Sequence, residues 1–157
     1  MALAKILFWL ALGTWVGAIV FFSFVVAPGV FATLPSESAG QVVGAIFPRY
    51  YVFGIVAEGI AAAAAAFLWQ AASRSRAWAA VTLMVGLMLG TTLYAARVVH
   101  PQAQALRPML HQPTVEPGVR ADFDRLHHAA VRLNAAVLVL GVVSMCVAAV
   151  SRDSPRP

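Results

Sequence analysis

Residues 50–72 read YYVFGIVAEGIAAAAAAFLWQAA, and this stretch decides the fold. Crossing the hydrocarbon core of a bilayer takes roughly 20 apolar residues in a helix, and the stretch meets that length with a single ionisable side chain, Glu58. It is rich in Ala and lacks the alternation of apolar and polar residues that a membrane barrel strand requires. We therefore interpret it as a transmembrane helix.

Three further stretches, residues 6–27, 77–96 and 133–150, contain no charged side chain. Over the whole chain 61% of the residues are hydrophobic and 11% are charged, whereas roughly a quarter of the residues of a soluble domain are charged. We predict an all-α integral membrane four-helix bundle that forms one domain. Its spans are expected near residues 6–27, 50–72, 77–96 and 123–150, followed by a polar tail at 151–157.

The ends of the spans are predicted from residues that favour or break helices. Pro28, Pro48 and Pro101 stand at the margins of spans and are expected to mark helix ends. Between the first two spans, residues 39–47 are predicted to form a short amphipathic helix at the membrane surface. Glycine pairs with a spacing that lets helices approach closely are present twice: Gly13 with Gly17, and Gly86 with Gly90. No internal repeat is predicted.

The basic residues indicate a membrane orientation. The net charge of +5 is spread over both sides of the four spans, so the expected partner is the lipid bilayer and not nucleic acid. The short basic connection at residues 73–76 lies between Trp69 and Trp78, which is typical of a cytoplasmic connection flanked by interfacial aromatic residues. We expect a plasma (inner) membrane protein with both termini in the cytoplasm.

Polar residues concentrate in the third connection and the helix ends beside it. All four histidines, His100, His111, His127 and His128, lie there. On the last helix Asp124, His127 and Asn134 share one broad face. Because adjacent histidines on a helix point about 100° apart, a metal or haem site would need His100 and His127 to face each other.

Glu58 is the only ionisable residue in the middle of a span. Such a carboxyl group is expected to face the bundle interior and to find a partner. Arg97, at the end of the third span, is the expected partner, and Tyr94 would line the same face. Our hypothesis is a buried cluster of Glu58, Arg97, His127 and Asn134 in the outer half of the bundle.

Several short motifs resemble those of the transmembrane protein 205-like family. In the first half they are Trp15-Val16-Gly17, Phe21, Val25-Val26-Ala27-Pro28, Phe31, Leu34, Ala39-Gly40 and Phe47-Pro48-Arg49-Tyr50-Tyr51. In the second half they are Arg97-Val98-Val99-His100-Pro101, Phe123, Leu126-His127 and Asn134. The resemblance implies a small multi-span membrane protein of undefined activity. It also implies functional importance for Arg97, His100, His127 and Asn134, with Pro28 and Tyr50 as structural markers.

The sequence contains no nucleophile–base pair, glycine-rich phosphate loop or catalytic zinc set, so an enzyme is not the favoured class. The favoured function is the handling of a small solute or metal species through a polar pocket at the outer membrane face. One alternative is haem binding between His100 and His127, and another is a structural or accessory subunit of a membrane complex. A pore built from four spans would need a homo-oligomer.

Overall fold

A computed structural model describes residues 1–72, 75–111 and 116–151, and within them the chain forms helices and no strand. The helices make four rods. The first rod joins α1 (Ala2–Phe21), the π-helical turn η1 (Phe22–Val26) and α2 (Ala27–Thr33), and the second is α3 (Ser36–Ala71). The third joins α4 (Arg76–Tyr94), the π-helical turn η2 (Ala95–Val99), α5 (His100–Leu106) and the 3-10 helix η3 (Arg107–His111). The fourth is α6 (Pro117–Val150).

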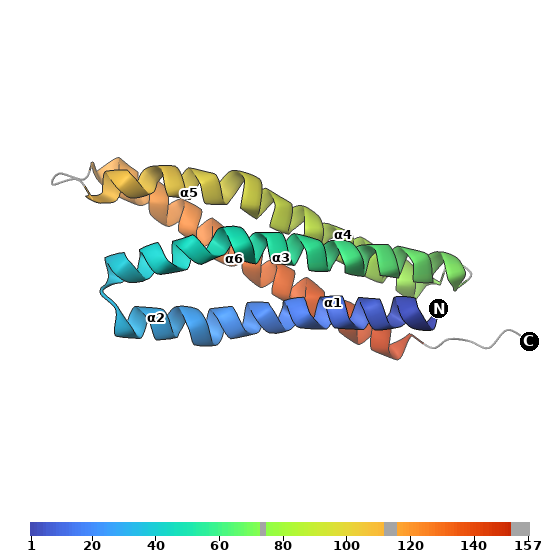
Figure 1. The fold of residues 1–157 in the computed structure, drawn as a ribbon. Coiled ribbons are helices and arrows are strands. Elements are labelled where there is room, and N and C mark those ends of the chain that lie inside the picture. Colours follow the sequence, from blue (N-terminus) through green and yellow to red (C-terminus); the bar gives the residue numbers. More distant parts are fainter. Residues whose placement is uncertain (73–74, 112–115, 152–157) are drawn as a thin grey trace, which may run out of the picture.

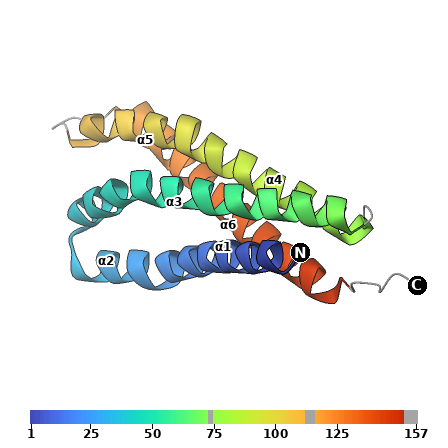
Figure 2. The same cartoon turned by 45° about the vertical axis from the view of Figure 1, so that its right-hand side comes forward.

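The four rods form a bundle whose neighbours in sequence are neighbours in space (Figures 1 and 2). Helix α1 packs along α3, α3 along α4, α4 along α6, and α6 closes the bundle against α1. The N-terminus and the end of α6 lie at the same end of the bundle as the point where α3 gives way to α4 (Figure 1). Each rod is long and apolar enough to cross a membrane. The predicted all-α four-helix membrane fold is therefore confirmed.

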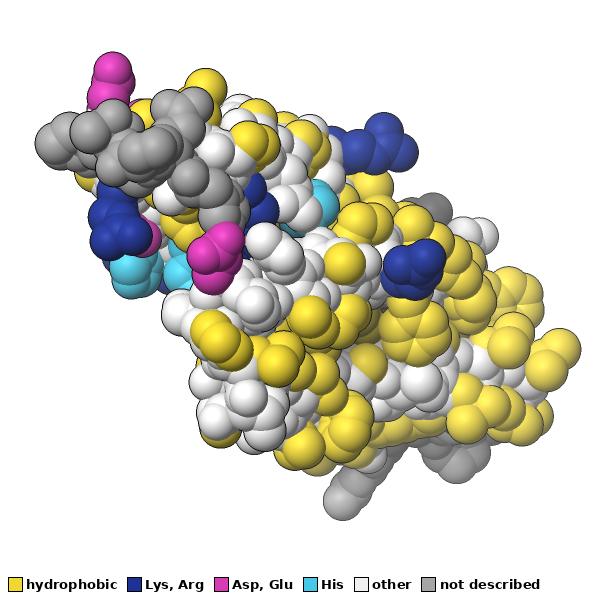
Figure 3. Space-filling view, turned by 60° about the vertical axis from the view of Figure 1, so that its left-hand side comes forward, with side chains coloured by type: hydrophobic (Ala, Val, Ile, Leu, Met, Phe, Trp, Pro, Cys, Tyr) yellow, Lys and Arg dark blue, Asp and Glu magenta, His cyan; other side chains and the backbone are white. Residues whose placement is uncertain are grey.

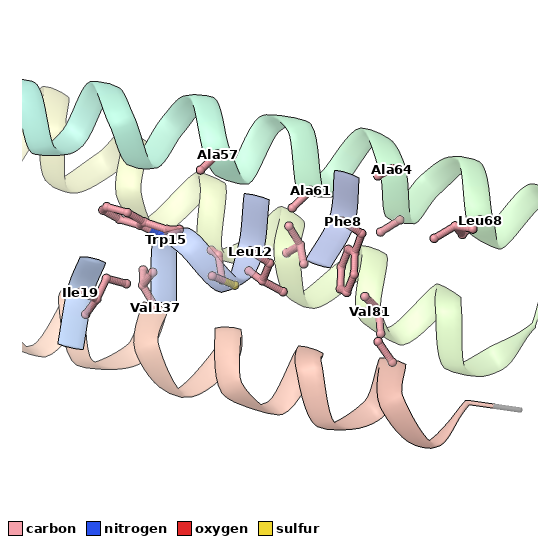
Figure 4. Close-up of a cluster of buried hydrophobic side chains, with 14 of the residues drawn as sticks. Phe8, Leu12, Trp15, Ile19, Ala57, Ala61, Ala64, Leu68, Val81 and Val137 are labelled. Atoms are coloured by element: carbon pink, nitrogen blue, oxygen red, sulfur yellow. The ribbon is translucent and has the colours of Figure 1, made fainter. Parts of the chain in front are cut away.

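The core places large side chains of α1 against small ones of α3 (Figure 4). Phe8, Leu12, Trp15 and Ile19 recur every three or four residues and are at most 1% exposed. The facing positions of α3 include buried alanines, which bring its backbone close to α1. Association of helices in lipid depends on such close packing, because lipid tails are as apolar as the side chains themselves.

Close approach occurs at glycines other than the predicted pairs. A Cβ atom at Gly54 would lie 2.5 Å from Cζ2 of Trp15, and one at Gly141 would lie 2.7 Å from Cγ2 of Val16. By contrast, a Cβ atom at Gly17, Gly86 or Gly90 would meet nothing within 4 Å. The predicted pairs therefore make no close packing inside this bundle. A span that is apolar all around carries no signal for its buried face, which is why spacing alone selected the wrong glycines.

The prolines do not end the helices, contrary to the prediction. Pro28 and Pro101 each follow a π-helical turn, and the rods continue through both residues. A proline has no N–H to donate to the carbonyl four residues earlier. The preceding turns instead close with wider hydrogen bonds, from the Ala27 N–H to the Phe22 carbonyl and from the His100 N–H to the Ala95 carbonyl. These turns accommodate the proline without breaking the rod.

The segment predicted as a separate short helix at residues 39–47 is helical but continuous with the second span. Helix α3 passes through Pro48, which leaves the Gly44 carbonyl without its usual donor. The side-chain Nε2 of Gln104 donates to that carbonyl at 3.3 Å. A side chain from α5 thus supplies the hydrogen bond that Pro48 cannot make, and the helix does not need to break. Helix α6 likewise begins earlier than expected, at Pro117, a residue suited to a first helical position.

The first and third rods are two versions of one structural unit, so the absence of a repeat was a wrong prediction. Pro101 follows Pro28 by 73 positions, and the same shift relates η1 to η2 and α2 to α5. It also relates the buried residues Phe8, Leu12, Trp15 and Ile19 to the buried residues Val81, Val85, Met88 and Thr92. Identical residues occur at Ala4/Ala77, Leu10/Leu83, Gly13/Gly86, Gly17/Gly90, Val25/Val98, Val26/Val99, Pro28/Pro101 and Ala32/Ala105. The core pairs all differ, which hides the repeat in the sequence.

The surface divides into a long apolar part and a charged end. Leu10, Phe24 and Leu83 are each more than 60% exposed along the rods, as expected for side chains that face lipid. Figure 3 shows acidic, basic and histidine side chains gathered at one end, while apolar side chains cover most of the rest of that face. Of the predicted polar tail, residues 152–157 lie outside the described residues.

Candidate functional site

Glu58 lies at the centre of the bundle and is 0% exposed. Its Oε1 atom accepts two hydrogen bonds, one from Nε1 of Trp15 at 2.7 Å and one from Oγ1 of Thr92 at 3.0 Å. Its Oε2 atom is buried and has no hydrogen-bond partner within the described chain. We call Glu58, Trp15 and Thr92 the Glu58 centre. Three helices, α1, α3 and α4, contribute to it.

Local packing explains why Trp15 can reach the carboxyl group. Gly54 lies one turn before Glu58 on α3, and the six-membered ring of Trp15 occupies the space that a Cβ atom there would fill. The indole also packs against Tyr50, with ring centroids 4.8 Å apart. The ring is therefore held on both sides, and its N–H is directed at the carboxyl group.

A second polar group links the other helices. The Tyr50 hydroxyl donates to Oδ1 of Asn134 at 2.8 Å, and Nδ2 of Asn134 donates to Oγ of Ser23 at 3.3 Å. We call these three residues the Asn134 bridge. It connects α3, α6 and η1, so the wider π-helical turn of the first rod supplies one of its members.

A small cleft lies between the Glu58 centre and the Asn134 bridge. Among the residues that line it are Trp15, Tyr50, Thr92 and Asn134, which carry polar groups, and the apolar Val137. All four rods contribute, and the free volume is on the order of one water molecule. The cleft thus brings indole, phenol, hydroxyl and amide groups together in the interior of the bundle.

The predicted cluster of Glu58, Arg97, His127 and Asn134 does not form. Arg97 and His127 are exposed, and Glu58 takes its hydrogen bonds from Trp15 and Thr92 instead. Asn134 does reach the interior, where it borders the cleft. Among the other predicted site residues, Tyr94 is 53% exposed and Asp124 is exposed at the start of α6.

The two histidines considered for a metal or haem have different surroundings. His100 is half-buried, with its ring centroid 5.9 Å from that of Phe47 and 5.7 Å from that of Tyr51. The exposed His127 stacks on Phe123 at 6.5 Å. Within the described residues no three His, Cys, Asp or Glu side chains are grouped as a metal ion would require. The arrangement of these side chains therefore gives no support to a metal or haem site.

His128 makes its contact within its own helix. Nδ1 of His128 lies 2.7 Å from the carbonyl oxygen of Asp124 in its own helix. The side chain of His111 lies outside the described part of the structure.

The charged end of the bundle contains an interhelical contact that the sequence did not predict. Arg107 donates from its guanidinium group to the Gly40 carbonyl. A Cβ atom at Gly44 would lie 2.9 Å from Cζ of Arg107, so the guanidinium lies directly over that glycine. The same guanidinium lies 5.9 Å from the ring centroid of Phe123, within range of a cation–π interaction. Arg107 therefore ties η3 to α3 and α6.

The residues that sequence reasoning missed are uncharged or lie on the face opposite the predicted one. Thr92, Ala95 and Val99 form the buried face of the third rod, whereas Tyr94 and Arg97 were expected there. The available signal was that Trp15 and Thr92 each carry a hydrogen-bonding group within an apolar span, but no pattern in the third span marks its buried face. The chemistry that the site offers is hydrogen bonding to a small molecule and the binding of a proton by a buried carboxyl group.

Comparison with known proteins identifies one curated relative and one protein family. A curated protein of Aquifex aeolicus (strain VF5), described as uncharacterized, is 45% identical over 60 residues. That match covers 38% of this chain and 41% of the relative, so the chain matches less than half of the relative's length. No solved structure matches this chain. The model of a domain of unknown function, DUF4149, matches residues 10–112, which is more than half of the chain and includes the whole Glu58 centre. The chain therefore belongs to the DUF4149 family.

Proposed function

We propose that this protein binds a small hydrogen-bonding solute in the cleft between its four rods and assists its passage through the membrane. The observation that carries the proposal is the convergence of polar side chains from all four rods on one cleft, beside the Glu58 centre. Polar groups are costly inside a membrane and usually serve a substrate or ion pathway there. The two rods that share one structural unit meet at this cleft, and transporters commonly place their sites between repeats.

The lining favours a neutral or singly charged solute over a metal ion. The lining residues with polar groups are Trp15, Tyr50, Tyr51, Thr91, Thr92 and Asn134, which carry indole, hydroxyl and amide groups. Transition metals prefer imidazole and thiolate ligands. The single cysteine, Cys146, is exposed on α6 and does not line the cleft. We therefore favour a small solute over a metal ion as the ligand of the cleft.

Osmotic flux measurements test this proposal. Proteoliposomes containing the purified protein are mixed with urea, glycerol or ammonium chloride, and re-swelling is followed by light scattering. We expect at least one of these probes to enter faster than into protein-free liposomes. Asn134→Leu, which removes an amide from the cleft, should return entry to the protein-free rate, whereas Asn134→Gln should retain part of it. Entry of every probe at the protein-free rate contradicts the proposal.

A second candidate function is a structural or accessory subunit of a membrane complex. The interhelical hydrogen bonds of the Asn134 bridge and of Arg107 favour it, because they hold the helices together without requiring any ligand. Under this function Asn134→Leu lowers stability but changes no flux. A homo-oligomer remains a proposed assembly for either function, since four spans are few for a monomeric pathway. Chemical cross-linking in native membranes measures it directly.

Haem binding remains the weakest proposal, and the absorbance spectrum of the purified protein tests it. A Soret band that disappears in His100→Ala would establish haem binding. The closer assignment to the transmembrane protein 205-like type is also a proposal. It rests on the sequence motifs named above, among them Pro28, Phe47-Pro48-Arg49-Tyr50-Tyr51 and His100-Pro101.

We further propose that the protein lies in the plasma (inner) membrane with both termini in the cytoplasm. The ends of α1 and α6 share one end of the bundle (Figure 1), and Lys5 and Arg76 lie in the first turns of α1 and α4 at that end. Basic residues in short segments favour the cytoplasmic side. A protease added to spheroplasts should leave a tag on the C-terminus intact, and removal of the tag contradicts this orientation.

A further inference from the structure

Glu58 carries an oxygen atom that the fold does not use. Oε1 accepts both available hydrogen bonds, whereas the equally buried Oε2 has no partner in the described structure. Both donors, an indole N–H and a hydroxyl, are neutral. A buried carboxylate without a cation is costly in a membrane, and a bound proton removes that charge. We infer that Glu58 is a proton-binding site that exchanges its proton with the cleft through the hydroxyl group of Thr92.

Thr92 is the contact that can relay a proton. It lines the cleft and lies 3.0 Å from Oε1 of Glu58, whereas Glu58 does not line the cleft itself. Trp15 also lines the cleft and contacts Oε1 at 2.7 Å. An indole N–H donates but has no lone pair with which to accept, while a hydroxyl group both donates and accepts. Of the two side chains that separate the carboxyl group from the cleft, only the hydroxyl can pass a proton onward.

The exchange step conserves protons. A hydronium ion in the cleft loses a proton to Oγ1 of Thr92 and becomes water, while the original hydroxyl proton passes along the hydrogen bond to Oε1 of Glu58. One O–H bond breaks at the hydronium ion and one at the threonine, and one O–H bond forms at the threonine and one at the carboxylate. Thr92 is unchanged at the end, and Glu58 has gained one proton. The reverse sequence returns the proton to the cleft.

The surroundings of Glu58 place no other charge at this site within the described residues. On its own helix the nearest titratable groups are Tyr50 and Tyr51, and the Tyr50 hydroxyl is engaged with Asn134. Helix α1 contributes Lys5 near its far end, and α2 contributes no titratable group. The third rod contributes Arg76 at the start of α4, Tyr94 and Arg97 with exposed side chains, His100 against Phe47 and Tyr51, and Arg107 in η3 over Gly44. The titratable side chains of α6 are exposed. Within the described residues no other carboxyl group and no imidazole group is hydrogen-bonded to Glu58.

This inference rests on the proposed function in one respect, since both use the same cleft. If a solute enters the cleft, its binding and the proton on Glu58 become linked through Thr92, and solute passage becomes coupled to proton movement. The proton site itself requires no solute. It can therefore be tested on the full-length protein alone.

Infrared spectroscopy of the full-length protein in lipid nanodiscs tests the proton site. The carbonyl stretch of a protonated carboxylic acid is assigned to Glu58 by its loss in Glu58→Gln. After a switch from H₂O to D₂O, the shift of this band reports proton exchange. We expect Thr92→Val to slow the shift on the order of a hundredfold, the lower end of what one positioned proton-transfer group contributes. Thr92→Ser should restore the fast exchange.

One control variant separates the relay from the loss of a hydroxyl group elsewhere on the same helix. Thr82→Val removes a hydroxyl on α4 where Thr82 donates to the Trp78 carbonyl, and it should leave the exchange rate unchanged. If Thr92→Val does not fold, Thr92→Ala provides the same test.

Two results would overturn the inference. The absence of a carboxylic acid band that depends on Glu58 would show an ionised side chain, and exchange at the wild-type rate in Thr92→Val or Thr92→Ala would exclude the relay. Failure of the proposed function looks different, because the flux of urea, glycerol and ammonium would be absent while the exchange of the Glu58 proton remained fast and dependent on Thr92.

Discussion

The first and third rods share a helix, a π-helical turn and a proline in the same order, but their core side chains differ. Where the first rod packs Phe8, Trp15 and the partly buried Phe22 into the core, the third rod places Val81, Met88 and Ala95. The backbone plan is thus the common feature, and the side chains distinguish the two rods. The difference is greatest at the Glu58 centre, where Trp15 of the first rod and Thr92 of the third donate to the same oxygen atom.

This comparison shows how one structural unit can serve two purposes in a small membrane protein. The bulky rings of the first rod fill the space over the small residues of α3 (Figure 4). The thinner side chains of the third rod leave room for the cleft beside Ala95 and Thr92. If the two rods had the same core side chains, both would carry bulky rings and fill the cleft, or both would carry small side chains and leave a larger space.

Truncation of the equivalent core residues is the strongest test of the asymmetry. Trp15→Ala removes a fully buried ring and one of the two hydrogen bonds to Glu58, and we expect it to lower the free energy of unfolding by about 3–5 kcal/mol. Met88→Ala, at the equivalent buried position of the third rod, should cost less because it breaks no hydrogen bond. Unfolding in mixed micelles of increasing SDS content measures both variants, and equal losses would contradict the asymmetry.

A single methyl group at the closest contact of the first rod should have the next largest effect. Gly54→Ala places a Cβ atom 2.5 Å from Cζ2 of Trp15, so the indole must move away from Glu58. We expect a loss of about 1–3 kcal/mol, as for other overpacked cores. Gly59→Ala on the same helix meets nothing within 4 Å and should not destabilise the protein. Tryptophan fluorescence and SDS unfolding are measured on the same variants. An unchanged emission spectrum together with an unchanged free energy of unfolding in Gly54→Ala would contradict this prediction.

The Asn134 bridge should contribute less than the core. Tyr50→Phe removes the hydroxyl group that donates to Asn134, and interhelical hydrogen bonds in membranes average about 0.6 kcal/mol. Tyr94→Phe is the matched control, because Tyr94 is 53% exposed and lies on the lipid-facing side of the third rod. The same SDS titration compares the two variants. A larger loss of unfolding free energy in Tyr94→Phe than in Tyr50→Phe would contradict the lipid-facing position of Tyr94.

The smallest expected effect concerns the hydrogen bond that replaces the one lost at Pro48. Gln104→Leu should cost less than about 0.6 kcal/mol, because the donor that it removes lies 3.3 Å from the Gly44 carbonyl, a longer hydrogen bond than the one between Tyr50 and Asn134 at 2.8 Å. In a Pro48→Ala background the new backbone N–H can donate to the same carbonyl, and Gln104→Leu should then cost almost nothing. The four variants form a double-mutant cycle, and strictly additive losses would show that the two donors do not replace each other.

Much of the candidate site lay beyond sequence reasoning for a physical reason. Glu58 was recognisable because a carboxyl group inside an apolar span must face protein rather than lipid. Its partners were not, since the third span is apolar on every side and gives no sign of which face is buried. The long side chain of Arg97 can extend from the end of its span toward the headgroups at little cost, so its charge did not require a partner inside the bundle.

The sequence by itself determined the four spans, the all-helical class and the burial of Glu58, because the transfer of apolar and charged groups between water and lipid depends on composition. Only the tertiary structure decided which residues meet Glu58, how the helices pass through Pro28, Pro48 and Pro101, and that two rods share one plan. These features depend on the rotation of each helix about its axis and on hydrogen bonds between residues far apart in the chain. Neither is encoded in the hydropathy of a single span.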